Sequence, residues 1–130
     1  MSERFSAALT SFVAEHIPSV LALEVLLLLR ASRSRSWDAA TLAGELRIDR
    51  HFAGAQLEAL ARSGLLERPG EGASYRYAPS SPERDEIVRE LDTEYAERRV
   101  SIVTLIYAAP TERVRAFADA FRVRKEPEDG

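Results

Sequence analysis

The chain has 130 residues and a mass of 14.5 kDa, the size of one ordinary domain or one small domain with appendages. Hydrophobic residues make up 45% and charged residues 30%, as in globular rather than disordered or fibrous proteins. The absence of cysteine excludes disulfide scaffolds, thiolate metal sites and cysteine nucleophiles. The two histidines, His16 and His51, lie 35 positions apart, which argues against a histidine-rich metal site.

The net charge of −3 is not that of a generic polyanion-binding protein, and the charge is unevenly distributed. Residues 18–80 contain eight basic and seven acidic residues, whereas residues 81–130 contain nine basic and twelve acidic residues. The longest apolar stretch, Val20–Leu29, has Glu24 in its middle and is too short to span a bilayer. No apolar segment of the kind found in signal peptides follows Met1–Arg4. We therefore expect a cytoplasmic protein with no membrane partner.

The N-terminal region is expected to form two helices. Apolar residues at three- and four-residue spacing predict an amphipathic helix over Ser2–His16, with Ser2 as its N-cap. Pro18 marks a break and suits the first turn of a second helix, Pro18–Ala31. Because that helix is apolar on nearly every side, we expect it to be the central buried helix. The polar connection Ser32–Ser36 follows it.

Two shorter helices are expected next. Asp38 is a good N-cap for a helix over Ala39–Arg47. After a short turn, Asp49 is a good N-cap for a helix over Arg50–Ser63. Gly64 is suited to close this second helix, because glycine commonly follows the last helical residue.

The pattern then changes from helix to strand. Two strand-like segments, Leu65–Arg68 and Ser74–Ala78, flank the Pro/Gly-rich turn Pro69–Gly72 and predict a β-hairpin. In the second segment, Tyr75 and Tyr77 are expected to point to the same side. The predicted fold class is therefore mainly α with a small β-hairpin.

The C-terminal region is expected to be helical. Ser81 as N-cap and Pro82 as first residue start a helix that is predicted to continue through Val100–Ala109. A strand is the alternative for those last ten residues, because many of them favour sheets. Pro110 ends this stretch, and a last amphipathic helix is predicted over Thr111–Val123.

The order helix, short helix, tight turn, helix and hairpin resembles a winged helix-turn-helix domain, and Trp37–Pro79 carries the resemblance. The run of Ala53, Leu57, Leu60 and Gly64–Leu66 is similar to the recognition-helix segment of many bacterial regulators. With helices on both sides, the whole chain looks most like a small regulator of the MarR or PadR kind. It departs from that pattern in two places. The wing lacks the aspartate-and-arginine motif usual in MarR proteins, and the turn between the two helices lacks the glycine often found there.

The resemblance implies a division of the chain into four parts. These are residues 1–17 for dimerisation or packing, a winged helix-turn-helix domain over 18–80, dimerisation helices over 81–123, and a loose tail over 124–130. It also implies that residues 50–63 form a recognition helix in the major groove of DNA, while the wing, residues 65–78, contacts the phosphate backbone.

A rotation of 100° per residue divides this recognition helix into two faces. The core face carries Ala53, Leu57, Leu60, Ala61 and Gly64. The outward face carries His51, Phe52, Ala55, Glu58, Ala59 and Arg62, with Gln56 on a flank. The side chains expected at base edges or thymine methyl groups are Arg50, His51, Gln56 and either Phe52 or Ala55. Those expected at phosphates are Arg47, Arg62, Arg68 and Arg76, with Arg33 and Arg35 as additional contacts.

Two alternatives compete with DNA binding. The arginines could form an ordinary solvated surface, because Glu45, Glu58, Glu67 and Glu71 lie among them. Phe52, flanked by alanines, is unusual on a DNA-reading face and fits equally well a winged-helix protein-interaction module that does not bind DNA. Alternatively, Phe52 simply packs against the wing or the preceding helix.

No pattern in the sequence predicts an enzyme, a metal site or a cofactor. The acidic residues of Glu83–Glu97 are expected to form a solvated face with nearby arginines, as in the pair Glu94–Arg98. The sequence contains no Gly-rich phosphate loop, Ser/His/Asp order or metal-ligand spacing.

The flanking helices carry more apolar surface than one winged helix can cover, which predicts a homodimer. The expected dimer contacts are Leu91, Tyr95, Ile102, Ile106, Val114, Phe117 and Phe121. The two recognition helices would then lie about 34 Å apart, one turn of DNA. The alternative is a monomer whose flanks fold back onto their own domain. A small-molecule effector could bind between the domain and the dimer helices, although no residue identifies one.

Overall fold

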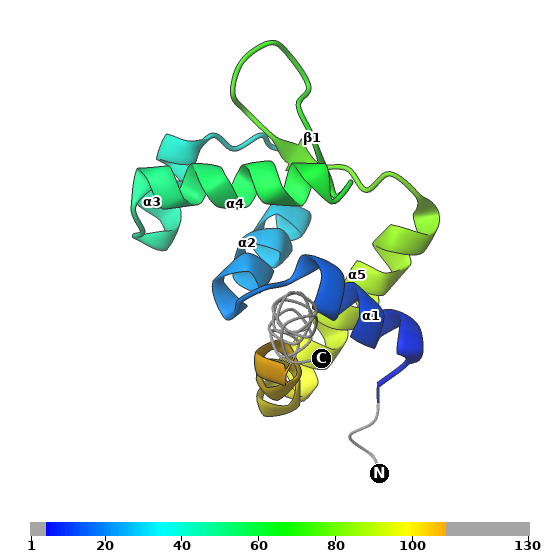
Figure 1. The fold of residues 1–130 in the computed structure, drawn as a ribbon. Helices are drawn as coiled ribbons and strands as arrows, with labels where there is room; N and C mark the ends of the chain where they lie inside the picture. Colours follow the sequence, from blue (N-terminus) through cyan, green and yellow to red (C-terminus); the bar gives the residue numbers. More distant parts are fainter. Residues whose placement is uncertain (1–4, 109–130) are drawn as a thin grey trace, which may run out of the picture.

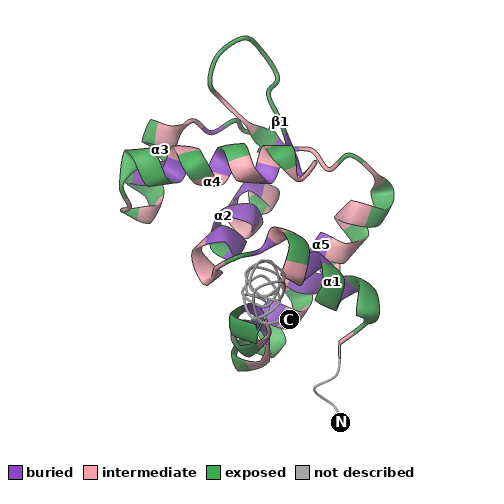
Figure 2. Cartoon of the chain, viewed as in Figure 1, coloured by how far each residue is buried: buried purple, intermediate pink, exposed green. Residues whose placement is uncertain are grey.

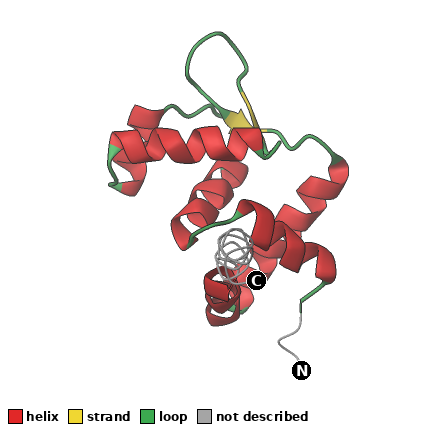
Figure 3. Cartoon of the chain, viewed as in Figure 1, coloured by secondary structure: helices red, strands yellow, loops and turns green. Residues whose placement is uncertain are grey.

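The computed structural model describes residues 5–108, and these residues are mainly helical with one small antiparallel hairpin (Figures 1 and 3). The elements are α1 (Ala7–His16), α2 (Val20–Ala31), α3 (Ala39–Leu46), α4 (Arg50–Arg62), β1 (Leu66–Glu67), β2 (Arg76–Tyr77) and α5 (Pro82–Glu97). A further helix, Arg99–Ala108, follows α5. This confirms the predicted class, mainly α with a small β-hairpin. Helix α3 packs along α4, α2 packs against α4 and β2, and α1 packs on α5.

Side-chain caps fix where the helices begin. As predicted, Asp38, Asp49 and Ser81 cap α3, α4 and α5 through their side-chain oxygens. The two N-terminal starts were predicted too early. Helix α1 begins at Ala7 because Ser6 accepts the Leu9 amide at 3.1 Å, and α2 begins at Val20 because Ser19 accepts the Ala22 amide at 3.0 Å.

A single hydrophobic core joins the helices, and α2 is at its centre (Figure 2). The buried side chains of α2 are Ala22, Leu23, Val25, Leu26 and Leu29. Glu24 lies on the exposed side of the same helix, which explains a charge in the middle of an apolar stretch. Among the described residues, no polar or charged side chain is fully buried.

The hairpin has very short strands, and backbone hydrogen bonds join it to the connection between α2 and α3. Leu66 pairs with Tyr77, and Glu67 pairs with Arg76. Tyr75 lies outside this ladder and forms an isolated bridge with Trp37, in which two N–H···O bonds of 2.7 Å join the hairpin to the α2–α3 connection. The long loop of the hairpin projects beyond α4 at the top of Figure 1.

A polar cluster joins α2, β2 and α5. The Tyr77 hydroxyl donates to Asp85 at 2.6 Å, and Arg30 pairs with Asp92 at 3.1 Å while lying 3.9 Å from Asp85. Burial and the bond to Asp85 raise the pKa of the Tyr77 hydroxyl above its usual value. This cluster therefore holds the hairpin against α5.

The predicted continuous helix after Pro82 is interrupted at Arg98, whose φ and ψ of −136° and 58° are not helical. The strand alternative for Val100–Ala109 is also wrong as far as Ala108, because Arg99–Ala108 is helical. The break allows Ile102 to reach the same core as α5. The predicted helix Thr111–Val123 and the tail lie outside the described residues.

Tyr95 ties the helices on both sides of this break to α2. Its hydroxyl donates to Glu24 at 3.2 Å and accepts from Arg99 at 3.0 Å, and the Arg99 guanidinium lies 4.5 Å from the centre of its ring.

Within residues 5–108, no single helix has both the length and the apolar composition to cross a membrane. Among the described helices, only the pair α1 and α2 has that length and apolar composition, and the chain bends by 107° between the two helices.

Candidate functional site

The outward side of α4 is uncovered along its length (Figure 2). Ala53, Leu57 and Leu60 are buried on the inner side, while His51 and Phe52 are exposed on the outer side. The predicted division of this helix into two faces is therefore confirmed. Phe52 is 47% exposed, so neither the hairpin nor α3 covers it completely.

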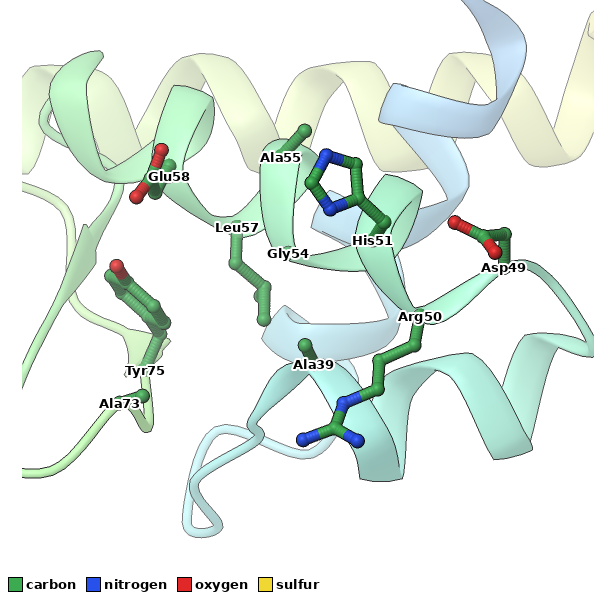
Figure 4. Close-up of a pocket in the computed structure, with 10 residues that line it drawn as sticks. All are labelled: Ala39, Asp49, Arg50, His51, Gly54, Ala55, Leu57, Glu58, Ala73 and Tyr75. Carbon is green, nitrogen blue, oxygen red and sulfur yellow. The ribbon is translucent and has the colours of Figure 1, made fainter.

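A groove of about 610 Å³ lies between the first turns of α4, the start of α3 and the hairpin loop (Figure 4). Its lining residues are Ala39, Asp49, Arg50, His51, Gly54, Ala55, Leu57, Glu58, Ala73 and Tyr75. Figure 4 shows His51, Ala55 and Glu58 along α4, with Tyr75 on the hairpin side and Arg50 extending past Ala39. The groove thus combines one arginine, two carboxylates and an aromatic wall.

The groove brings together the predicted DNA contacts Arg50 and His51 with Ala55, the alternative to Phe52 for a thymine methyl contact. The other predicted contacts are outside its lining: Arg47, Phe52, Gln56, Arg62, Arg68 and Arg76. Arg47 lies in the turn between α3 and α4, and Phe52 lies on the uncovered side of α4.

The turn between α3 and α4 is tight and contains an unusual backbone conformation. Arg47 has φ 58° and ψ 48°, and it is the only non-glycine residue with positive φ in the described part of the chain. The sequence showed that glycine is missing from this turn, and the structure shows that Arg47 adopts the conformation that glycine would adopt most easily. The Asp49 cap follows immediately and starts α4.

Arg50 belongs to α4, but its charge acts on the start of α3. The Thr41 backbone amide and hydroxyl hold the pKa of the Asp38 carboxyl below its usual value, and the positive charge of Arg50 lowers this pKa further. Arg50 therefore lies near the N-terminus of α3 while it lines the groove.

The hairpin arginines make contacts within the hairpin itself. Arg76 holds Glu67 through two nitrogens, Nε at 2.8 Å and a terminal nitrogen at 2.7 Å. Arg68 donates to the Gly72 carbonyl at 2.9 Å, and its guanidinium carbon lies 5.9 Å from the centre of the Tyr75 ring. Both side chains are exposed, but each already has a partner.

Two further predicted phosphate contacts are also engaged. Arg62 lies 3.8 Å from Glu58 on α4, and both side chains are well exposed. Arg35 stacks on Trp37, with its guanidinium carbon 3.8 Å from the ring centre. Arg35 and Arg62 therefore fit the alternative prediction of a solvated surface on which arginines contact neighbouring side chains.

Four residues that line the groove were not predicted from the sequence: Ala39, Gly54, Ala73 and Tyr75. A Cβ added to Gly54 would lie 3.5 Å from the Cβ of Ala39, so small residues allow α3 and α4 to approach closely. A glycine in the middle of a predicted helix was the available signal for this contact. For Tyr75, no sequence signal indicated the bridge to Trp37.

Four of the predicted dimer residues lie in the core of the single chain: Leu91, Tyr95, Ile102 and Ile106. They are covered by the chain's own side chains, as expected if the flanks fold back onto the domain. The other three, Val114, Phe117 and Phe121, lie outside the described residues. The large apolar side chains that remain exposed near the end of the described chain are Val100, at 77%, and Tyr107, at 70%.

Within residues 5–108, no three His, Asp or Glu side chains are grouped so that they could hold a metal ion. No protein-family model matches this chain, and no curated protein or solved structure is significantly similar to it.

Proposed function

We propose that this chain is a DNA-binding transcriptional regulator built on a winged helix-turn-helix and similar to the small regulators of the MarR or PadR kind. The observation that carries the proposal is the uncovered outer side of α4, which follows α3 after a short turn and has a hairpin beside it. A helix of this kind fits the major groove of DNA, which is about 12 Å wide.

In the proposed complex, the first turns of α4 enter the groove. Arg50 and His51 provide hydrogen-bond donors for base edges, and Gln56 lies on the flank of the helix. Phe52 or Ala55 would contact a thymine methyl group. Arg62 and the hairpin arginines Arg68 and Arg76, together with Arg47, are the candidates for phosphate contacts.

The proposed regulator is a cytoplasmic homodimer. One recognition helix in the major groove gives a small protein–DNA interface, and a twofold-symmetric dimer doubles that interface. The core positions of Leu91, Tyr95, Ile102 and Ile106 mean that the dimer contact must come largely from other residues. A small-molecule effector between the domain and the C-terminal helices remains part of the proposal, with no residue assigned to it.

The test is binding of the purified chain to DNA from the region upstream of its own gene, compared with a scrambled duplex of equal composition. The expected result is tighter binding to the upstream duplex, with an affinity that falls steeply as salt increases. Equal, weak binding to both duplexes at all salt concentrations would contradict the proposal.

A second function is favoured by one specific observation, the 47% exposure of Phe52. In this alternative, Phe52 and the neighbouring alanines of α4 bind another protein, and the chain does not bind DNA. The groove supports this alternative as well, because Asp49 and Glu58 offset the charge of Arg50.

Arg50→Glu and Phe52→Ala distinguish the two functions. Arg50 forms no hydrogen bond or ion pair within the described residues, so its reversal should abolish DNA binding and cost the fold only the attraction between Arg50 and Asp38. Reversal of Arg76 is less informative, because it would also break the two contacts of 2.7 and 2.8 Å with Glu67. DNA binding that survives Arg50→Glu, together with a protein partner that is lost only in Phe52→Ala, would favour the second function.

A further inference from the structure

Resting on the proposed DNA binding but revising which arginines meet the phosphates, we infer that the phosphate contacts come from Arg33, Arg47 and Arg50. Arg50 then contacts a phosphate rather than a base edge, and neither Arg62 nor the hairpin arginines bind phosphate. The hairpin then serves as a wall of the groove that the chain itself holds in place. The DNA footprint is displaced from the hairpin toward the α2–α3 connection and the α3–α4 turn.

The eight arginines of residues 18–80 differ in whether the described chain already engages them. Five of them have a partner in the described chain: Arg30 with Asp92, Arg35 with Trp37, Arg62 with Glu58, Arg68 with Gly72 and Arg76 with Glu67. The other three, Arg33, Arg47 and Arg50, are exposed and form no hydrogen bond or ion pair within residues 5–108. These three cations can bind a phosphate without giving up a hydrogen bond or ion pair to the described part of the chain.

The hairpin would lose internal contacts by binding phosphate. Arg76 would have to leave the two contacts of 2.7 and 2.8 Å with Glu67, and the exposed Glu67 carboxylate would then repel the phosphate. Arg68 would have to release the Gly72 carbonyl that it holds at 2.9 Å. With Glu67 and Glu71 beside Arg68 and Arg76, the hairpin has no net positive charge to attract DNA.

Arg33, Arg47 and Arg50 lie around the start of α3 and its junction with α4. Arg47 and Arg50 are on either side of the Asp49 cap, at the junction of α3 and α4. Arg33 lies on the connection that leads into the start of α3, and Arg50 lies close enough to that start to lower the pKa of Asp38. Because the Asp38 and Asp49 carboxylates accept the helix amides of Thr41 and Phe52, their charges are already partly compensated.

The test uses single alanine variants of the full chain and the salt dependence of binding to the same duplex. The slope of log K against log salt is negative, and loss of one phosphate contact decreases its magnitude by about 0.9. We expect this decrease for Arg33→Ala, Arg47→Ala and Arg50→Ala. The matched controls, Arg62→Ala, Arg68→Ala and Arg76→Ala, should retain the full slope. Thermal unfolding of each variant establishes that it is folded at the assay temperature.

Two outcomes overturn the inference in different ways. If the unsubstituted chain binds no duplex at low salt, the proposed function fails and the inference fails with it. If the chain binds DNA but the slope decreases in Arg68→Ala and Arg76→Ala rather than in the other three, DNA binding stands. The footprint then includes the hairpin, and the inference alone is wrong.

Discussion

Arg47 combines an unfavourable backbone conformation with a freely exposed charge. A left-handed conformation costs a residue with a Cβ roughly 1–2 kcal/mol, and glycine avoids this cost. We therefore predict that Arg47→Gly increases the free energy of unfolding by about 1 kcal/mol, measured as a higher urea midpoint. If our inference on phosphate contacts is correct, the same variant binds DNA more weakly although it is more stable.

The control for this prediction is Arg47→Ala, which removes the charge but keeps the Cβ. Its stability should stay within about 0.5 kcal/mol of the unsubstituted chain, as is usual for exposed positions. An equal gain in both variants would mean that charge repulsion, rather than the backbone conformation of the turn, limits the stability of the chain.

The Tyr77 hydroxyl gives the fold a dependence on alkaline pH. Its pKa is raised in the folded chain, so its contribution to stability is complete below the unfolded value of about 10 and is lost as the pH rises above it. We predict that Tyr77→Phe lowers the free energy of unfolding at pH 7 by about 1–2 kcal/mol, through loss of the bond to Asp85. Urea unfolding at pH 8 to 11 should show a shallower alkaline decline for the variant. Parallel declines for both proteins would exclude Tyr77 as the source.

At the level of elements, Gly64 controls how the hairpin leaves α4. Its φ is +80°, and an added Cβ would lie 3.0 Å from the Ser80 hydroxyl oxygen. We predict that Gly64→Ala lowers the free energy of unfolding by about 1–2 kcal/mol, because the backbone conformation and the contact are both unfavourable. The matched control is Gly70→Ala in the hairpin loop, where an added Cβ has no atom within 4 Å. Equal thermal unfolding of the two variants would contradict this explanation.

Local signals in the sequence were sufficient for most of the elements. Asp38, Asp49 and Ser81 each fix a helix start through a bond within one turn, and the sequence identified all three. The break at Arg98 was not predictable, because no proline or glycine marks it. Beyond the break, Ile102 lies in a core built from distant segments, and contacts of that kind leave no local pattern in the sequence.

In the candidate site too, features set by local sequence were predictable, and features set by contacts between distant residues were not. The exposed face of α4 follows from helical periodicity, so His51 and Phe52 were placed correctly. The engagement of Arg68 and Arg76 was not predictable, because their partners depend on the register and the loop shape of the hairpin. The bridge between Tyr75 and Trp37 joins residues 38 positions apart and leaves no local pattern.

At the level of the whole molecule, α5 and the helix Arg99–Ala108 belong to the core of one chain. Ile102 is fully buried there, so we predict that Ile102→Ala lowers the free energy of unfolding by about 2–4 kcal/mol at every protein concentration. The control is Val100→Ala, which removes a side chain that is 77% exposed and should change stability by less than about 0.5 kcal/mol. Loss of the concentration dependence of Tm in Ile102→Ala, without a loss of stability, would instead indicate a subunit contact.

Trp37 is the only tryptophan of the chain, and it is 2% exposed at the point where the hairpin joins the α2–α3 connection. Its indole N–H donates to Ser32 at 3.1 Å, Arg35 covers its ring, and its backbone is bonded to Tyr75. The protein therefore carries its own optical probe next to the groove. When the hairpin opens or a partner displaces Arg35, the surroundings of the indole change, and so does its fluorescence. Binding can thus be followed on the unlabelled chain, with the signal arising from the joint between hairpin and helices.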